Sequence, residues 1–144
     1  MDREELKNLL PHREPLLLVD KCEHSDDGGV IAEYTIREDE FFTRGHFPGN
    51  PIVPGVILCE IMAQCGVLLM EESLKDNVAL YAGIDGARFK RQVKPGDKVV
   101  VKARITNRRG PLFVTKSTAY VDNKVCCSGN LSFMLVPKSE MTTV

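Results

Sequence analysis

The chain has 144 residues, of which 43% are hydrophobic and 27% are charged, and its formal net charge is −1. This composition is typical of one soluble globular domain that occupies residues 1–144. The longest apolar stretch, residues 54–70, contains Glu60 and Gln64 and is shorter than the roughly 20 apolar residues of a membrane-spanning helix, which excludes a membrane span.

The five cysteines are odd in number, and none of their spacings resembles a zinc site. Residues 1–5 are mostly charged, and no apolar signal region follows them. Free thiols in a protein without such a region indicate the cytoplasm.

The first half of the chain alternates short elements with turns. Asp2 can cap a helix over residues 3–10. Residues 16–23 and 30–36 have the composition of strands, and the Ser-Asp-Asp-Gly-Gly turn between them predicts a hairpin. After a loop rich in proline and glycine, a helix is expected over residues 54–74. Because this helix is apolar on all sides, we expect it to be buried.

The second half of the chain alternates apolar and polar residues with a period of two, which is the pattern of strands. Turn signals rich in glycine, proline, asparagine and aspartate separate several of these segments. The expected strands are residues 78–84, 87–93, 98–106, 113–121 and 125–136. One buried helix followed by an antiparallel meander predicts an α+β fold in which the sheet curls around the helix.

The charges are distributed unevenly along the chain. Residues 1–86 hold 17 acidic and 7 basic residues, whereas residues 87–109 hold nine basic residues and one acidic residue. The basic stretch is either a solvated strand face or a docking patch for an acidic partner. Nucleic acid is a weaker candidate, because the stretch has one aromatic residue, Phe89, and no known binding motif.

A histidine and a glutamate that stand near each other in the sequence indicate acid–base chemistry. His46 lies in a loop stiffened by prolines and glycines, and Glu60 follows inside the otherwise apolar helix. Burying an unpaired carboxyl group is costly, so Glu60 either pairs with a basic residue of a strand or takes part in chemistry. Burial favours the neutral carboxyl, which can give up a proton. Gln64 lies one helical turn after Glu60, on the same side, and can orient the carboxyl group.

Gly55 would sit in the first turn of the same helix, where backbone N–H groups lack intrahelical partners. A substrate carbonyl could accept a hydrogen bond there, and its developing negative charge would be stabilised. With His46 as base and Glu60 as acid, these groups suit the removal of a proton next to a carbonyl with loss of a β-hydroxyl. The two side chains need not belong to one chain, because a homodimer could join them.

Several motifs run in order from about residue 6 to about residue 135, nearly the whole chain. They are Leu10-Pro11-His12-Arg13, Leu16-Leu17-Leu18-Val19-Asp20, Gly45-His46-Phe47-Pro48-Gly49, Pro54-Gly55-Val56, Gly83-Ile84-Asp85-Gly86-Ala87-Arg88-Phe89 and Pro95-Gly96-Asp97. Through these motifs, and through Glu60 and Gln64, the chain resembles the bacterial (3R)-3-hydroxyacyl-[acyl-carrier-protein] dehydratases of type II fatty acid synthesis.

The resemblance implies the hot-dog fold, in which a long central helix is wrapped by a curved antiparallel sheet. Two subunits would pair their sheets, and three such dimers would form a hexamer. Each active site would take His46 from one subunit and Glu60 from the other, and the Gly55 amide would bind the thioester carbonyl. Neither a metal nor a bound organic cofactor is expected. His12, in the first motif, is interpreted as structural because no acid partner stands beside it.

The resemblance also implies that an acyl carrier protein delivers the substrate. The acyl chain, tethered to the phosphopantetheine arm of the carrier, would enter an apolar tunnel, for which Tyr81 and Phe89 are candidate lining or gate residues. The basic residues Arg88, Lys90 and Arg91 would meet the acidic carrier.

Three alternatives stay open. Some relatives also isomerise the trans-2 double bond to cis-3, and the His46 and Glu60 motifs do not separate the two activities. A hot-dog thioesterase would use a helical carboxylate to activate water, although the complete loop at residues 46–49 speaks against it. A module that only binds acyl groups or their carrier is disfavoured because both His46 and Glu60 are present.

Overall fold

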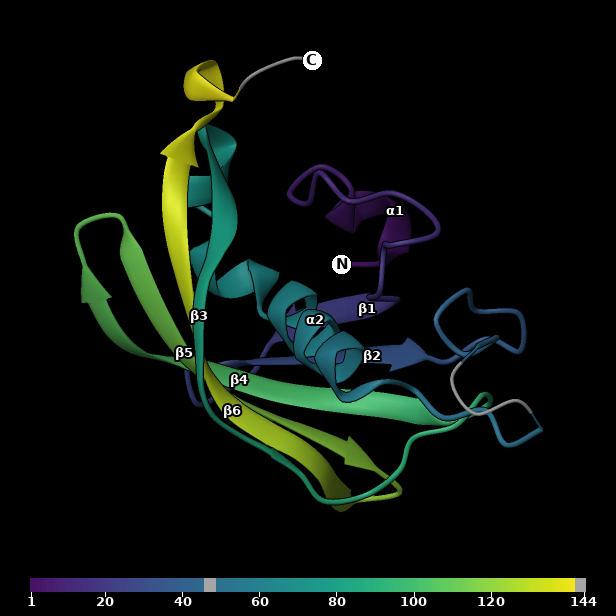
Figure 1. Ribbon diagram of the computed structural model, residues 1–144. Coiled ribbons are helices and arrows are strands. Elements are labelled where there is room, and N and C mark those ends of the chain that lie inside the picture. Colours follow the sequence, from purple (N-terminus) through teal and green to yellow (C-terminus); the bar gives the residue numbers. More distant parts are fainter. Residues whose placement is uncertain (46–48, 142–144) are drawn as a thin grey trace.

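The computed structural model describes residues 1–45 and 49–141, and its core is an antiparallel sheet with one main helix (Figure 1). In these residues the helices are α1 (Arg3–Leu6) and α2 (Gly55–Cys65), with short 3₁₀ helices at Val67–Met70, Ser73–Lys75 and Lys138–Glu140. The strands are β1 (Lys21–His24), β2 (Val30–Thr35), β3 (Asn77–Phe89), β4 (Lys98–Arg109), β5 (Leu112–Val121) and β6 (Lys124–Pro137).

The strands form one sheet in the order β1-β2-β4-β5-β6-β3, and every neighbouring pair is antiparallel. The sheet curves around α2, which lies against its concave face (Figure 1). Helix α2 contacts β2, β4, β5 and β6, and its buried side chains join the main hydrophobic core. The predicted α+β fold, with a sheet curled around a helix, is therefore confirmed. No helix in the described part of the chain is long and apolar enough to cross a membrane.

Helix α2 is shorter than the sequence pattern suggested. It begins at Gly55 directly after Pro54 and ends at Cys65, where Gly66 follows. Glycine is a poor helix former, and beyond it the chain continues in 3₁₀ turns, with the Leu69 N–H bonded to the Gly66 carbonyl at 3.0 Å. The prediction of one helix to residue 74 is therefore wrong in its second half. The expected all-round burial is also wrong at the start of the helix, because Val56 is 75% exposed.

The first strand is also shorter than expected, because a side chain replaces a strand partner. The prediction placed a strand over residues 16–23, but β1 begins only at Lys21. Instead, the buried Gln64 side chain bonds both the Leu18 N–H, at 2.7 Å, and the Leu16 carbonyl, at 2.9 Å. The amide thus holds this segment against α2 in the way that a neighbouring strand would.

Strand β3 joins the two strands expected at 78–84 and 87–93. It pairs with β6 through two irregularities, and Gly86, with a φ of 60°, lies in the second of them. The strand also forms one edge of the sheet, with β6 as its only partner in the described residues. None of its residues is buried, whereas β4, β5 and β6 each contain buried residues, and its exposed side chains include Leu80, Ile84 and Phe89.

Candidate active site

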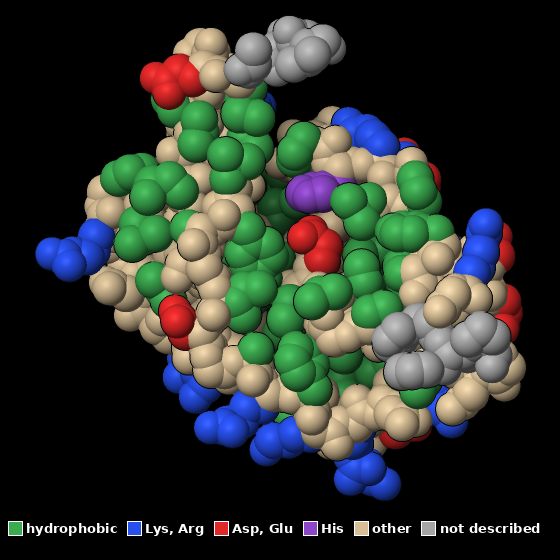
Figure 2. Space-filling model, in the orientation of Figure 1, with side chains coloured by type: hydrophobic (Ala, Val, Ile, Leu, Met, Phe, Trp, Pro, Cys, Tyr) green, Lys and Arg blue, Asp and Glu red, His purple; other side chains and the backbone are tan. Residues whose placement is uncertain are grey.

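Glu60 lines a mostly apolar cavity of about 170 Å³ between α2, β3 and the segment after α1. Its side chain is 25% exposed, so the carboxyl group opens into this cavity and is not sealed in the core. Figure 2 shows a histidine and an acidic side chain meeting in a hollow that is surrounded by hydrophobic side chains. The cavity therefore combines an ionisable acid with walls suited to an aliphatic ligand.

Gln64 holds the Glu60 carboxyl group in place. Its Nε2 atom donates a hydrogen bond to Oε2 of Glu60 at 2.8 Å, across one turn of α2. Because Gln64 is only 1% exposed and is bonded to the backbone of Leu16 and Leu18, its amide has little freedom to rotate. The structure thus brings together the two helix residues that the sequence pattern paired.

His12 lies beside Glu60, which corrects the expectation that it has no acid partner. Its Nε2 atom is 3.6 Å from Oε2 of Glu60, and both side chains line the same cavity. The Nδ1 atom of His12 is buried and has no hydrogen-bond partner in the part of the chain that is described. Spacing could not reveal this contact, because folding joins a loop near the N-terminus to the middle of α2. The only signal was that His12 belongs to one of the motifs.

His46, the predicted base, lies outside the described residues, as do Phe47 and Pro48. Its position relative to Glu60 therefore stays a prediction.

Gly55 begins α2, and the ring of Phe89 lies directly against it. A Cβ atom built on Gly55 would be 2.9 Å from Cε1 of Phe89, which is closer than real side chains approach. No side chain caps this end of the helix in the described residues, so no cap competes for its amides. Gly55 and Phe89 line an open hollow of about 410 Å³ together with Lys90 and Arg91.

Tyr81 lines the Glu60 cavity, whereas Phe89 lines the hollow beside Gly55. The Tyr81 hydroxyl donates to the Cys59 carbonyl at 2.8 Å, and its ring lies 5.1 Å from that of Phe133. Burial raises the pKa of Tyr81 far above its usual range, so the hydroxyl stays protonated and keeps this bond. The two aromatic residues named as tunnel candidates therefore lie in different hollows.

The predicted carrier-docking residues Arg88, Lys90 and Arg91 are all exposed at the end of β3. The backbone amides of Lys90 and Arg91 bond the Cys126 carbonyl, which fixes this segment to β6. Figure 2 shows basic side chains gathered along one edge of the molecule. Other members of the basic stretch have partners on the sheet itself: Lys98 pairs with Glu33 at 3.1 Å, which fits a solvated strand face.

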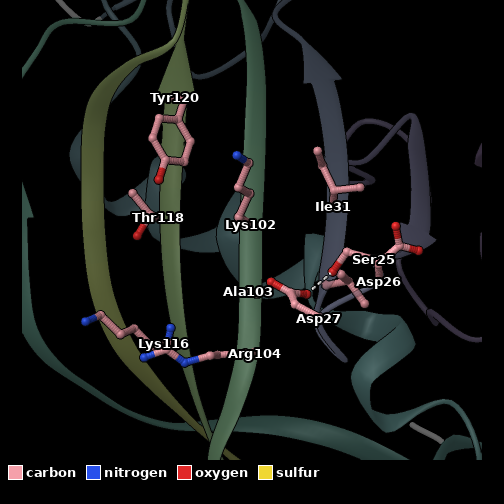
Figure 3. Close-up of a pocket in the computed structure, with 11 residues that line it drawn as sticks. Ser25, Asp26, Asp27, Ile31, Lys102, Ala103, Arg104, Lys116, Thr118 and Tyr120 are labelled. Atoms are coloured by element: carbon pink, nitrogen blue, oxygen red, sulfur yellow. Dashed lines mark hydrogen bonds between the residues drawn. The ribbon is translucent and has the colours of Figure 1, made fainter.

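A larger cavity, of about 510 Å³, lies over β2, β4 and β5 and shares no lining residue with the Glu60 cavity (Figure 3). Its lining includes Lys102, Arg104 and Lys116 on the strands, and a bond between Ser25 and Asp27 closes one end. Lys102 lies over the Tyr120 ring at 5.3 Å. This wide, open face has no histidine and no lone carboxyl in apolar surroundings, so the candidate active site is the cavity at Glu60.

Comparison with protein families gives a match to the FabA-like domain over residues 10–130. A protein of Bacillus pumilus is 41% identical over 141 residues, covering 96% of this chain and 98% of that protein. A protein of Clostridium perfringens is 43% identical over 137 residues, covering 94% and 99%. Both relatives are named 3-hydroxyacyl-[acyl-carrier-protein] dehydratase FabZ.

Solved structures show the same fold at lower identity. A subunit of the dehydratase heterocomplex ApeI:P from Xenorhabdus doucetiae superposes with a TM-score of 0.77 at 19% identity, covering 94% of this chain and 93% of that one. A mutant thioesterase from Pseudomonas aeruginosa superposes with a TM-score of 0.67 at 19% identity, covering 95% of both chains. These likenesses confirm the expected hot-dog fold.

Proposed function

The chain belongs to the FabA-like family and to its 3-hydroxyacyl-[acyl-carrier-protein] dehydratases, and on this premise we propose the reaction that takes place at Glu60. The substrate is a (3R)-3-hydroxyacyl thioester on an acyl carrier protein. The products are the trans-2-enoyl thioester and water, a step of fatty acid elongation.

The reaction divides between a base, an acid and an oxyanion donor. His46 takes the proton from C2, and the electrons of that C–H bond form the new C2–C3 double bond. The C3–O bond breaks, and Glu60 gives its proton to the departing hydroxyl, which leaves as water. The Gly55 N–H bonds the thioester oxygen and stabilises the negative charge that builds there. Glu60 finishes as a carboxylate and His46 as an imidazolium, and proton exchange restores both.

The observation that carries this proposal is the environment of the Glu60 carboxyl group. Gln64 binds its Oε2 atom at 2.8 Å, whereas no residue in the described ranges bonds its Oε1 atom. The cavity around the carboxyl group is mostly apolar, and its Oε1 atom, without a described partner, can face a substrate hydroxyl.

We also propose that the working unit is a homodimer formed through β3. An edge strand with unpaired backbone groups and exposed apolar side chains is a template for pairing with a second chain. The exposed Val56 at the start of α2 adds apolar surface for such a partner. In this dimer His46 of one chain meets Glu60 of the other. A hexamer of three dimers rests on the family resemblance alone.

The acyl carrier protein docks at the basic end of β3. Lys90 and Arg91 line the hollow that also contains Gly55, so a carrier bound there would deliver its thioester next to the helix amides. Arg88, two residues earlier in the strand, extends the positive surface. Charge complementarity with an acidic carrier would speed the encounter and make it sensitive to salt.

The test uses carrier-linked 3-hydroxyacyl and enoyl thioesters. It follows the absorbance of the enoyl group and the change in thioester mass when one water molecule is lost or gained. We expect wild type to interconvert them and His46→Ala and Glu60→Gln each to lower the rate at least about a hundredfold. The matched controls are His24→Ala and Glu71→Gln, which remove an exposed His–Glu pair with a 3.2 Å contact elsewhere on the molecule. Both control variants should keep the wild-type rate.

The same reactions distinguish the alternatives. Release of free thiol without water exchange would contradict the dehydratase and identify a thioesterase. Formation of a cis-3 enoyl product beside the trans-2 product would identify a bifunctional dehydratase and isomerase. Full activity in both His46→Ala and Glu60→Gln would overturn the assignment of the acid and the base.

A further inference from the structure

We propose that His12 is a positioning residue for Glu60. Together with Gln64 it binds the Oε2 atom and so selects Oε1 as the oxygen that passes a proton to the leaving hydroxyl. This inference rests on the proposed function, because it assigns a role in the same proton transfer.

Both neighbouring groups approach the same oxygen of Glu60. The Nε2 atom of Gln64 lies 2.8 Å from Oε2, and the Nε2 atom of His12 lies 3.6 Å from it. The second distance is longer than a hydrogen bond, and it can close with a small movement of the 25% exposed Glu60 side chain. Catalytic hydrogen bonds are often long without ligand and shorten when substrate binds.

The surroundings of His12 favour one tautomer of its ring. Its Nδ1 atom is buried without a partner in the described residues, so a proton there would be an unsatisfied buried donor. That tautomer would also turn the Nε2 lone pair toward the lone pairs of Oε2. A proton on Nε2 avoids both costs and makes His12 a donor to Glu60.

Two donors on Oε2 decide where the proton of neutral Glu60 resides. Oε2 must accept from both N–H groups, so the carboxyl proton belongs on Oε1, the oxygen without a described partner. When that proton leaves, the two donors already face the new carboxylate and stabilise it. His12 thereby orients the acid and lowers the cost of its ionisation during the reaction.

Other titratable groups near Glu60 do not replace His12. On β3, the Tyr81 hydroxyl is engaged with the Cys59 carbonyl. On α2, the Cys59 thiol is hydrogen-bonded to the Cys127 thiol of β6. Among the described residues, His12, in the segment after α1, is therefore the titratable side chain that faces the Glu60 carboxyl group.

The experiment compares His12→Ala, His12→Gln and His12→Asn with His24→Ala as the matched histidine control. We expect His12→Ala to lower kcat by about tenfold to a hundredfold, the effect of losing one hydrogen bond to an ionising group, with KM little changed. Glutamine should recover most of this loss, because its amide N–H can reach the place of the histidine Nε2. Asparagine is too short and should not. His24→Ala should match wild type.

The readouts separate this role from a structural one and from failure of the proposed function. A purely structural role would lower the unfolding midpoint of the variants and leave kcat of the folded enzyme unchanged, which would overturn the inference. A change confined to KM, or a glutamine variant as slow as alanine at every pH, would overturn it as well. Absence of dehydration by wild type would instead remove the proposed function.

Discussion

At the scale of single residues, one buried amide serves both the fold and the site. Gln64 accepts a bond from the Leu18 N–H and donates to the Leu16 carbonyl and to Glu60. Such a side chain is expensive to bury unless each polar atom has a partner, and here each does. The same contacts that tie the segment before β1 to the helix therefore also orient Glu60, the proposed catalytic acid.

Replacing Gln64 with leucine should damage stability and catalysis together. The change leaves the buried Leu18 N–H and the partly buried Leu16 carbonyl without their partner, which costs about 1–3 kcal/mol of unfolding free energy. It also frees the Glu60 carboxyl group, so we expect kcat to fall. Urea denaturation and initial rates at saturating substrate measure the two effects. A destabilised variant with unchanged kcat would show that Gln64 supports only the fold.

Residue identities and spacing predicted part of this site. The i, i+4 spacing of Glu60 and Gln64 follows from helix geometry, and the structure shows the contact. The proximity of His12 and Glu60 could not be predicted in that way, because it depends on how the segment after α1 folds over the helix. Local patterns report neighbours along one element, whereas this contact joins two elements.

At the scale of elements, boundaries were harder to predict than the elements themselves. The turn signal at residues 25–29 correctly predicted the β1–β2 hairpin, and the alternation of apolar and polar residues correctly predicted the β4–β5–β6 meander. The end of α2 differs because Gly66, a poor helix former, follows Cys65, whereas the start of β1 differs because of a tertiary contact in which Gln64 takes the place of a strand partner. Strand β3 is continuous, where two strands were predicted, because its pairing with β6 resumes after the irregularity at Gly86.

The start of α2 offers a prediction about close packing. Gly55→Ala keeps the backbone N–H but places a Cβ atom 2.9 Å from the Phe89 ring, so the ring must move. Because Phe89 flanks the proposed thioester site, we expect kcat/KM to fall about tenfold, which corresponds to a modest steric cost. Adding Phe89→Ala removes the clash, and the double variant should exceed Gly55→Ala in kcat/KM. A double variant no better than the single one would show that the glycine acts in another way.

At the scale of the whole molecule, the exposed edge of the sheet supports the proposed pairing with a second copy of the chain. The inner strands of the sheet are covered by α2, but β3 exposes apolar side chains along an open edge, among them Ile84 at 46% exposed. A monomer with such an edge would be prone to association. The proposed dimer covers this edge and completes the active site in one step.

Placing a charge on this edge should separate the subunits. In a dimer paired through β3, Ile84→Arg would bring two unpaired charges into an apolar interface, so we expect monomers and a large loss of dehydration. Ile105→Arg, on the inner strand β4, is the matched control because that isoleucine is also partly exposed, at 37%. Light scattering gives the mass of each variant. Dimers of Ile84→Arg with full activity would rule out this interface.

The most direct test of a site shared by two chains mixes two inactive variants. His46→Ala and Glu60→Gln, co-expressed with different tags and purified through both, would form dimers in which one site holds an intact His46 and an intact Glu60. We predict that these mixed dimers recover about half of the wild-type dehydration rate, one of two sites, while each variant alone stays inactive. Mixed dimers as inactive as the parent variants would contradict a His46–Glu60 site built across the interface.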